Sequence, residues 1–250
     1  ASDKPLYSVT ASNMASYATQ LTAGQKALLK KYPTWKMNVY PSRRSAAFPQ
    51  SVYDDSAANI KRVSLVDGGN GFVGTSSGVP FPQPASGVEV IWNHITAYRG
   101  NSFSVSSQQA AVTVSGDYTP VRFETMYDFQ YNNQTKSSAE REPNKLINVI
   151  SQITAPARLA GQALLVHEYI DQVKNPRMAW TYNPGQRRVR LAPNVAYDNP
   201  GAASDGLRTN DDITLFNGAT DRYNWTLVGK KELLVPYNAY ALGSDKLKIS

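Results

Sequence analysis

A chain of 250 residues can bury a full hydrophobic core, in one large domain or two small ones. It contains no cysteine, which excludes disulfides, thiol nucleophiles and thiolate metal sites. The 26 lysines and arginines exceed the 19 aspartates and glutamates, giving a net charge of +7. These basic residues occur as scattered pairs, which is typical of a basic surface and only weakly indicates an anionic partner. No nucleic-acid-binding motif occurs, and no apolar run reaches the roughly 18 residues of a membrane-spanning helix.

The first quarter of the chain, residues 1–62, predicts a mainly helical region that packs on the rest. The expected elements are an extended or disordered start, a helical segment from residue 12, a helix over 23–31, a strand over 34–40 and a short helix over 51–62. Thr22 is a favourable N-cap for the second of these helices, and Tyr32-Pro33 ends it.

Residues 63–250 predict a strongly curved antiparallel sheet with one covering helix. A loop rich in glycine and proline, residues 67–84, shows no periodicity. Five large apolar residues then share one face of a helix over 88–98: Val88, Ile91, Trp92, Ile95 and Tyr98. Strands are expected over 103–114, 118–129, 146–153, 163–169, 179–182, 187–191 and 221–236, with irregular structure over 193–217. A helix with such an apolar face needs an apolar concave surface to pack against, and a curved sheet supplies one. The predicted fold class is therefore α+β, with helix and sheet in one domain overall.

The hairpin over 179–191 is the most informative segment. Trp180 and Tyr182 lie on one face at period two, and Asn183-Pro184-Gly185-Gln186 predicts a turn. On the returning strand, arginines alternate with Val189 and Leu191. The candidate ligand-binding residues are Trp92, Tyr98, Trp180, Tyr182, Arg187 and Arg188, with Trp225 as a further aromatic candidate. The alternative is that the aromatic residues form ordinary core and the arginines only keep the outer face polar.

Two glycine-containing motifs lack the context that their chemistry requires. Residues 69–74 match the dinucleotide pattern GxGxxG, and residues 74–78 match the hydrolase pattern GxSxG. Both need a helix directly afterwards, which Pro80 and Pro82 prevent. We therefore expect neither activity.

No other catalytic or metal-binding arrangement stands out. His94 and His167 do not have metal-ligand spacing, and Asp205, Asp211 and Asp212 do not have that of an EF-hand. We expect no catalytic residue, no metal and no cofactor, and hence no enzyme.

Several segments carry a resemblance to known envelope proteins. Residues 180–189, Trp-x-Tyr-x-Pro-Gly-x-Arg-Arg-Val, are similar to a strand-turn-strand of periplasmic lipoprotein-carrier-like domains of the LolA/LolB class. The whole chain resembles a proteobacterial envelope family, domain of unknown function 1329. The matching segments are 32–41 with 44–47, 65–71, 91–95 with 98–100, 155–161 and the arginine hairpin.

The resemblance implies an incomplete antiparallel barrel that holds helices in its mouth. It also implies an exported protein, with a leader before Ala1 and further strands after Ser250, that assists exporters of hydrophobic solutes. From residues and resemblance together we expect a binding protein in the periplasm, or on the periplasmic face of the outer membrane, that carries a lipid or another amphiphile. Arg43, Arg44, Arg187 and Arg188 would meet an anionic headgroup or a partner protein. The alternative is a non-catalytic adaptor or structural protein that docks an export complex.

Overall fold

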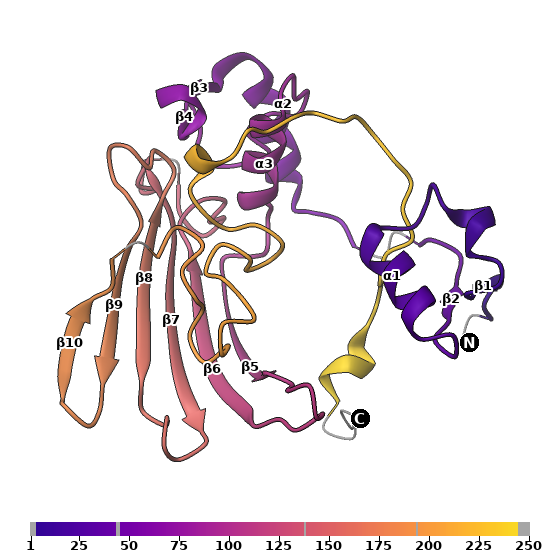
Figure 1. Cartoon of the computed structure of the whole chain (residues 1–250). Coiled ribbons are helices and arrows are strands. Elements are labelled where there is room, and N and C mark those ends of the chain that lie inside the picture. The colour runs from indigo at the N-terminus through magenta and orange to yellow at the C-terminus, as the bar shows by residue number, and fades with distance from the viewer. Residues whose placement is uncertain (1–3, 44–45, 138, 194, 245–250) are drawn as a thin grey trace. The chain divides into compact units, whose positions relative to one another are not determined.

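The computed structural model describes residues 4–43, 46–137, 139–193 and 195–244 (Figure 1). Its contacts divide the chain into two units, residues 1–47 with 228–250, and residues 48–227. The expected boundary at residue 62 differs from this division, because α2 (Gln50–Arg62) belongs to the larger unit. Its buried Asn59 donates hydrogen bonds from Nδ2 to the carbonyls of Ser77 and Val79, at 2.8 and 2.9 Å.

The smaller unit is a short strand pair and a helix around its own core. Its elements are β1 (Tyr7–Val9), the 3-10 helix η1 (Met14–Tyr17), α1 (Ala23–Lys31), β2 (Met37–Val39) and the 3-10 helix η4 (Tyr240–Gly243). Thr22 caps α1 in a capping box with Gln25, as the sequence predicts. Val9, Leu21 and Leu29 are buried, and Leu234 packs against them.

The larger unit contains a six-stranded antiparallel sheet in which neighbouring strands are consecutive in sequence (Figure 1). The strands are β5 (Ser102–Ala110), β6 (Pro120–Phe129), β7 (Lys145–Ala155), β8 (Ala163–Tyr169), β9 (Met178–Asn183) and β10 (Arg188–Leu191). β5 and β10 form the two edges, so the sheet is open. The α+β class and the antiparallel meander are thereby confirmed.

The strand register separates two faces of this sheet. On the covered face, Tyr127, Val149, Val166 and Ala179 lie in one row across four strands. On the outer face, Met126, Ile150, Leu165, Trp180 and Leu191 form a row across five strands. Tyr127 and Val149 contact the main core cluster, whereas Met126, Ile150 and Leu191 are exposed.

Helix α3 (Gly87–Ile95) packs its apolar face into this core. Ser86 and Glu89 form a capping box at its start. The helix ends at Ile95 because Thr96 leaves helical geometry, with its Oγ1 donating to the Trp92 carbonyl at 2.7 Å. The prediction that the helix extends to Tyr98 is therefore wrong, and Tyr98 does not lie on its apolar face.

The remaining elements correct two further expectations. The first residues of the predicted loop are not irregular: the 3-10 helix η2 (Asp67–Gly69) and β4 (Gly71–Val73) form a hairpin with the preceding strand β3 (Ser64–Val66). The strand predicted over 221–236 is wrong: the 3-10 helix η3 (Thr220–Arg222) is followed by chain without helix or strand. Trp225 packs on Phe216 and Tyr223, and Leu234 joins the smaller core, whereas Leu227, Val228, Leu233 and Val235 are exposed.

An irregular segment, residues 195–217, lies against the covered face (Figure 1). The buried Arg177 holds both ends of it, donating to the carbonyls of Val195 and Asn217 at 2.8 Å each. The same guanidinium forms an ion pair with the buried Glu168 on β8, with an N–O distance of 2.6 Å. We call this arrangement the arginine clamp.

Candidate functional site

The structure places the predicted ligand-binding residues on different surfaces. Trp92 has no exposed area, donates from Nε1 to the Gly69 carbonyl at 2.9 Å and packs edge-on against Phe72. Its role in this structure is that of core. Tyr98 lies beyond the end of α3, where its ring contacts Phe48 edge-on at 5.6 Å.

Trp180 and Tyr182 lie together, as period two predicts, but on the outer face. Their cross-strand neighbours are Leu191 and Val189. The Trp180 ring is half-buried and meets the His167 ring at 5.1 Å. Trp92 packs with the covered face, so these aromatic residues do not line one cavity with it.

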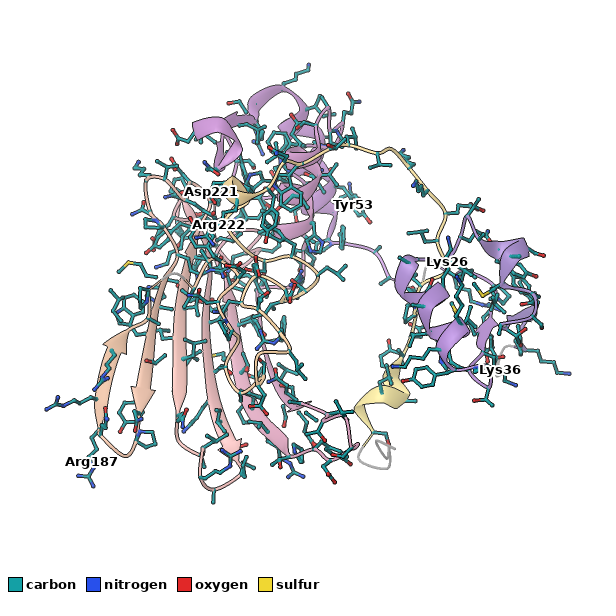
Figure 2. All side chains as sticks on the ribbon, viewed as in Figure 1. Lys26, Lys36, Tyr53, Arg187, Asp221 and Arg222 are labelled. Atoms are coloured by element: carbon teal, nitrogen blue, oxygen red, sulfur yellow. The ribbon has the colours of Figure 1, made fainter. Side chains whose placement is uncertain are left out.

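The predicted arginines are exposed at the end of the β9–β10 hairpin. Figure 2 shows Arg187 pointing away from the sheet. Among the described residues, neither Arg187 nor Arg188 forms an ion pair. Arg43 is exposed in the other unit, and Arg44 lies outside the described residues.

A cavity that the sequence analysis did not predict lies on the covered face, at the β5–β6 hairpin end. Its volume is about 420 Å³, and its floor includes the buried Val121 and Ile153. Ala111, Leu159 and Arg158 also line it. The rest of the lining is largely polar and includes Thr113, Asp117, Gln162 and Asp205, so polar and charged groups surround an apolar floor.

Apolar side chains also remain accessible further along the covered face, toward the start of β5. Phe103 is 40% exposed and Val105 is 37% exposed, although both lie on the face that carries the core. The Phe103 ring packs against Tyr127 and Phe129, with centroids 4.8 and 5.8 Å away. Period-two alternation in residues 103–105 and 123–129 is the sequence signal that could have identified this cluster.

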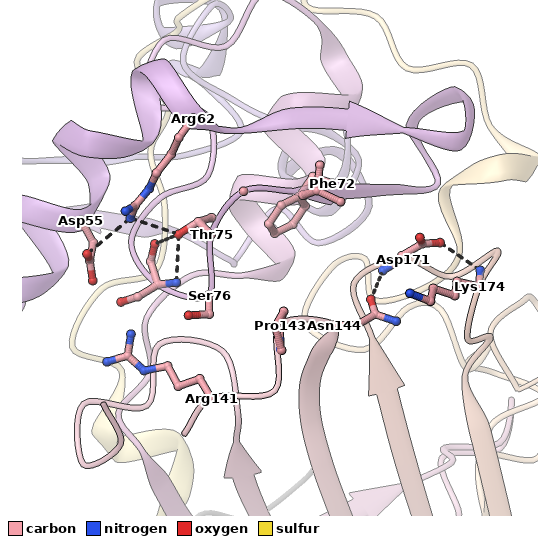
Figure 3. Close-up of a pocket in the computed structure, with 13 residues that line it drawn as sticks. Asp55, Arg62, Phe72, Thr75, Ser76, Arg141, Pro143, Asn144, Asp171 and Lys174 are labelled. Carbon is pink, nitrogen blue, oxygen red and sulfur yellow. Dashed lines mark hydrogen bonds and ion pairs between the residues drawn. The ribbon is translucent and has the colours of Figure 1, made fainter. Parts of the chain in front are cut away.

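A second pocket lies at the opposite end of the strands and is lined by the GxSxG segment (Figure 3). We call it the loop pocket, and its volume is about 430 Å³. Its lining residues are Asp55, Arg62, Phe72, Val73, Gly74, Thr75, Ser76, Ser77, Arg141, Pro143, Asn144, Asp171 and Lys174. They come from α2, β4, the following loop and the ends of two strand connections.

Buried polar groups fix the loop over 74–78. Asn132 accepts from the Gly78 N–H at 2.6 Å, and its own N–H donates to the Ser76 carbonyl at 3.0 Å. The Tyr131 hydroxyl donates to the Gly78 carbonyl at 2.8 Å. Burial raises the pKa of this hydroxyl, so it remains a protonated donor. The loop is held in one conformation by side chains from the end of β6 and from α2.

Both glycines of this segment are required by the backbone. Gly74 has φ +100°, and a Cβ there would lie 2.0 Å from the Arg62 carbonyl oxygen. Gly78 has φ +80°, and a Cβ there would lie 2.5 Å from the Ser56 nitrogen. The motif therefore reflects close packing on α2, and no helix occurs in residues 74–86, all of which are described.

Charges gather at both ends of the loop pocket. Arg62 pairs with Asp55 at 3.4 Å and donates to Thr75 Oγ1 at 3.4 Å, while Arg141 approaches from the other side (Figure 3). At the far end, Asp171 Oδ1 accepts from the Lys174 N–H at 2.9 Å. Phe72 and Pro143 lie between the two ends.

Neither a metal-ligand cluster nor a helix able to span a membrane occurs among the described residues. Among them, no group of three or more histidines or carboxylates is placed to hold a metal ion. No helix in the described part of the chain is long and apolar enough to cross a bilayer.

An open antiparallel sheet with helices on one side defines the molecule as an α+β protein, and comparison with known sequences gives its family. The chain belongs to the family described as "Protein of unknown function (DUF1329)", which matches residues 8–250. The "Uncharacterized protein PA3922" of Pseudomonas aeruginosa is 49% identical over 255 residues. That match covers 100% of this chain and 55% of the relative, so the chain spans about half the relative's length. No solved structure matches.

Proposed function

We propose that this chain binds an amphiphile on the covered face of its sheet, as an incomplete barrel of the lipoprotein-carrier type. The observation that carries the proposal is the accessible apolar surface of Phe103 and Val105, on the same face as the 420 Å³ cavity. Burying an acyl chain there would contribute roughly 25 cal/mol per Å² of apolar area. Arg158, Asp117 and Asp205, all on the cavity lining, would face a polar or zwitterionic headgroup.

The proposal also assigns a lid to the binding site and a cellular compartment to the protein. The segment over 195–217, tied down by Arg177, is the part of the cover that borders the cavity through residues 202–205. This segment is therefore the proposed lid, whereas α3, the covering helix that the sequence predicts, is fixed in the core through the fully buried Trp92. We place the protein in the periplasm, or at the periplasmic face of the outer membrane, on the strength of its resemblance to exported envelope proteins.

Displacement of a fluorescent fatty acid tests the proposal. Ala111→Trp puts an indole into the cavity, and we expect it to weaken binding about tenfold or more. Val112→Trp is the matched control, because Val112 is exposed, adjacent and not part of the lining. Absence of saturable binding, or equal binding by both variants, would contradict the proposal. Mass spectrometry of organic extracts from protein purified without detergent would then identify the cargo.

A second candidate function is that of an adaptor docking an export complex. The outer-face row favours it, because Met126, Ile150 and Leu191 are exposed in one line across the sheet. Exposed contiguous apolar surface is typical of interaction sites. Leu191→Lys would weaken capture of such a complex while leaving fatty-acid displacement unchanged, which separates the two functions.

A further inference from the structure

The loop pocket has hydrogen-bond donors that the protein itself does not use. Arg141 is half-buried, and only its Nε is engaged, donating to the Asn133 carbonyl at 2.8 Å. Its two terminal nitrogens have no partner within the described part of the chain. The Ser76 side chain likewise has no hydrogen bond among the described residues, although its backbone carbonyl is held by Asn132.

Arg62, Arg141 and Ser76 line the same pocket and come from different segments. Figure 3 shows the guanidinium groups of Arg62 and Arg141 on either side of the loop that carries Thr75 and Ser76. Arg62 projects from α2, whereas Arg141 projects from the connection between β6 and β7. Guanidinium groups bind oxyanions through two parallel N–H donors, and hydroxyls add single donors.

The local charge is positive at this end of the pocket. Asp55 neutralises Arg62 in part, at 3.4 Å, and Arg141 has no carboxylate partner in the described residues. Asp171 is the other carboxylate of the lining, and it lies at the far end with Lys174 (Figure 3). A ligand at the arginine end therefore meets two guanidinium groups and one carboxylate.

We propose that the arginine end of the loop pocket binds a phosphoryl group, with Arg141 as the main ligand-binding residue. A tetrahedral oxyanion presents acceptors in several directions, which suits donors from α2, the loop and the β6–β7 connection better than a planar carboxylate does. Asn59, Tyr131 and Asn132 fix the backbone of the loop, so the loop needs little ordering on binding. The Thr75 hydroxyl already donates to the Ser77 carbonyl at 2.7 Å, which leaves Ser76 as the hydroxyl donor for a ligand. This site is separate from the cavity on the covered face and does not depend on its function.

Calorimetric titration with inorganic phosphate, against chloride at equal ionic strength, tests the site. The whole chain should bind one phosphate saturably. Arg141→Gln should raise the Kd about tenfold or more, since it removes a charged two-nitrogen donor. Arg122→Gln is the matched control: it removes the same charge from an exposed position on β6 that has no ion pair among the described residues and lies outside the pocket lining, and it should leave the Kd unchanged.

A second variant covers the case in which Arg141→Gln disturbs the loop through Asn133. Ser76→Ala removes a hydroxyl that bonds nothing in the described structure, and we expect a Kd increase of about three- to tenfold with an unchanged thermal midpoint. Absence of saturable phosphate binding, an unchanged Kd in both pocket variants, or an equal increase in Arg122→Gln would each overturn the proposal.

The source of the phosphoryl group is resolved by a second titration. Phosphatidylcholine vesicles with and without phosphatidic acid are compared for the whole chain and for Arg141→Gln. Binding that needs both phosphatidic acid and Arg141 identifies a lipid headgroup. Saturable binding of inorganic phosphate without Arg141-dependent vesicle binding identifies a free phosphate or phosphate ester.

Discussion

The arginine clamp is the residue contact on which the covered face most depends. Arg177 and Glu168 are 6% and 7% exposed in their side chains, and one guanidinium serves a carboxylate and the carbonyls of Val195 and Asn217. Buried ion pairs of this kind add little net stability over apolar residues, but removing one partner leaves the other charge uncompensated.

We therefore expect Arg177→Met to lower the free energy of unfolding by about 3–5 kcal/mol, measured by urea denaturation. The double variant Arg177→Met with Glu168→Leu should regain part of this loss, because no buried charge then remains. The loss of unfolding free energy that remains in the double variant measures the two hydrogen bonds from Arg177 to the carbonyls of Val195 and Asn217. A single variant as stable as the original chain would contradict the clamp.

His167 makes stability depend on pH in a defined direction. Burial on the outer face, followed by the nearby Lys145, lowers its pKa from the ordinary value of 6.5. As pH falls below 6.5, the unfolded chain takes up a proton that the folded chain resists, so stability decreases. His167→Gln should flatten the dependence of unfolding free energy on pH just below 6.5. An unchanged slope would contradict this assignment.

Residue types and periodicity predicted which residues share a face of the sheet better than they predicted which face is buried. Trp180 and Tyr182 share a face with Leu191 and Val189, as alternation implies. Which face is covered depends on where α3 and residues 195–217 pack, and local spacing does not encode these long-range contacts. The sequence therefore grouped Trp92 with Trp180, although the sheet divides them.

At the scale of elements, the GxSxG loop gives a sharp test of backbone geometry. Gly74→Ala and Gly116→Ala both place a side chain at positive φ, which costs about 1–2 kcal/mol. Only at Gly74 would the new Cβ also meet backbone, 2.0 Å from the Arg62 oxygen, whereas nothing lies within 4 Å at Gly116. Gly74→Ala should therefore destabilise the chain more in thermal unfolding. Equal losses would contradict the close approach.

Elements with a regular period and a clear stop were predictable. α1 begins after Thr22, α3 begins after Ser86, and the six strands of the sheet lie close to their expected positions. The segment over 221–236 has strand-like composition but forms no strand: Trp225 packs on Phe216, Leu234 packs on the core of the smaller unit, and the valines of the segment are exposed. The loop pocket was missed because most of its lining residues come from connections that show no period.

At the scale of the whole molecule, the chain passes from the larger unit, which ends at residue 227, back to the smaller unit, which resumes at residue 228. Lys230 and Lys231 follow this point, are exposed and lie outside any helix or strand. Local unfolding of such segments costs little free energy, so they are preferred sites of proteolysis. Limited trypsin digestion followed by mass spectrometry should show cleavage there before any cut within β5–β10. First cuts inside the sheet would contradict the division.

The boundary between units was the least predictable feature at this scale. Residues 228–244 return to the first unit, where the Leu234 N–H donates to the Gln20 carbonyl at 2.9 Å. Sequence distance gives no sign of this contact. α2 reads as part of the N-terminal region, but Asn59 ties it to the loop over 74–79.

The arginine clamp closes the segment over 195–217 by a means that does not depend on the redox state of the compartment. Joining Val195 to Asn217 closes a ring of backbone, as a covalent cross-link would, yet the chain contains no cysteine. This closure is insensitive to oxidants, reductants and thiol exchange. It can also open and reform without a catalyst, so the segment over the cavity can be released and recaptured in an oxidising or a reducing compartment alike.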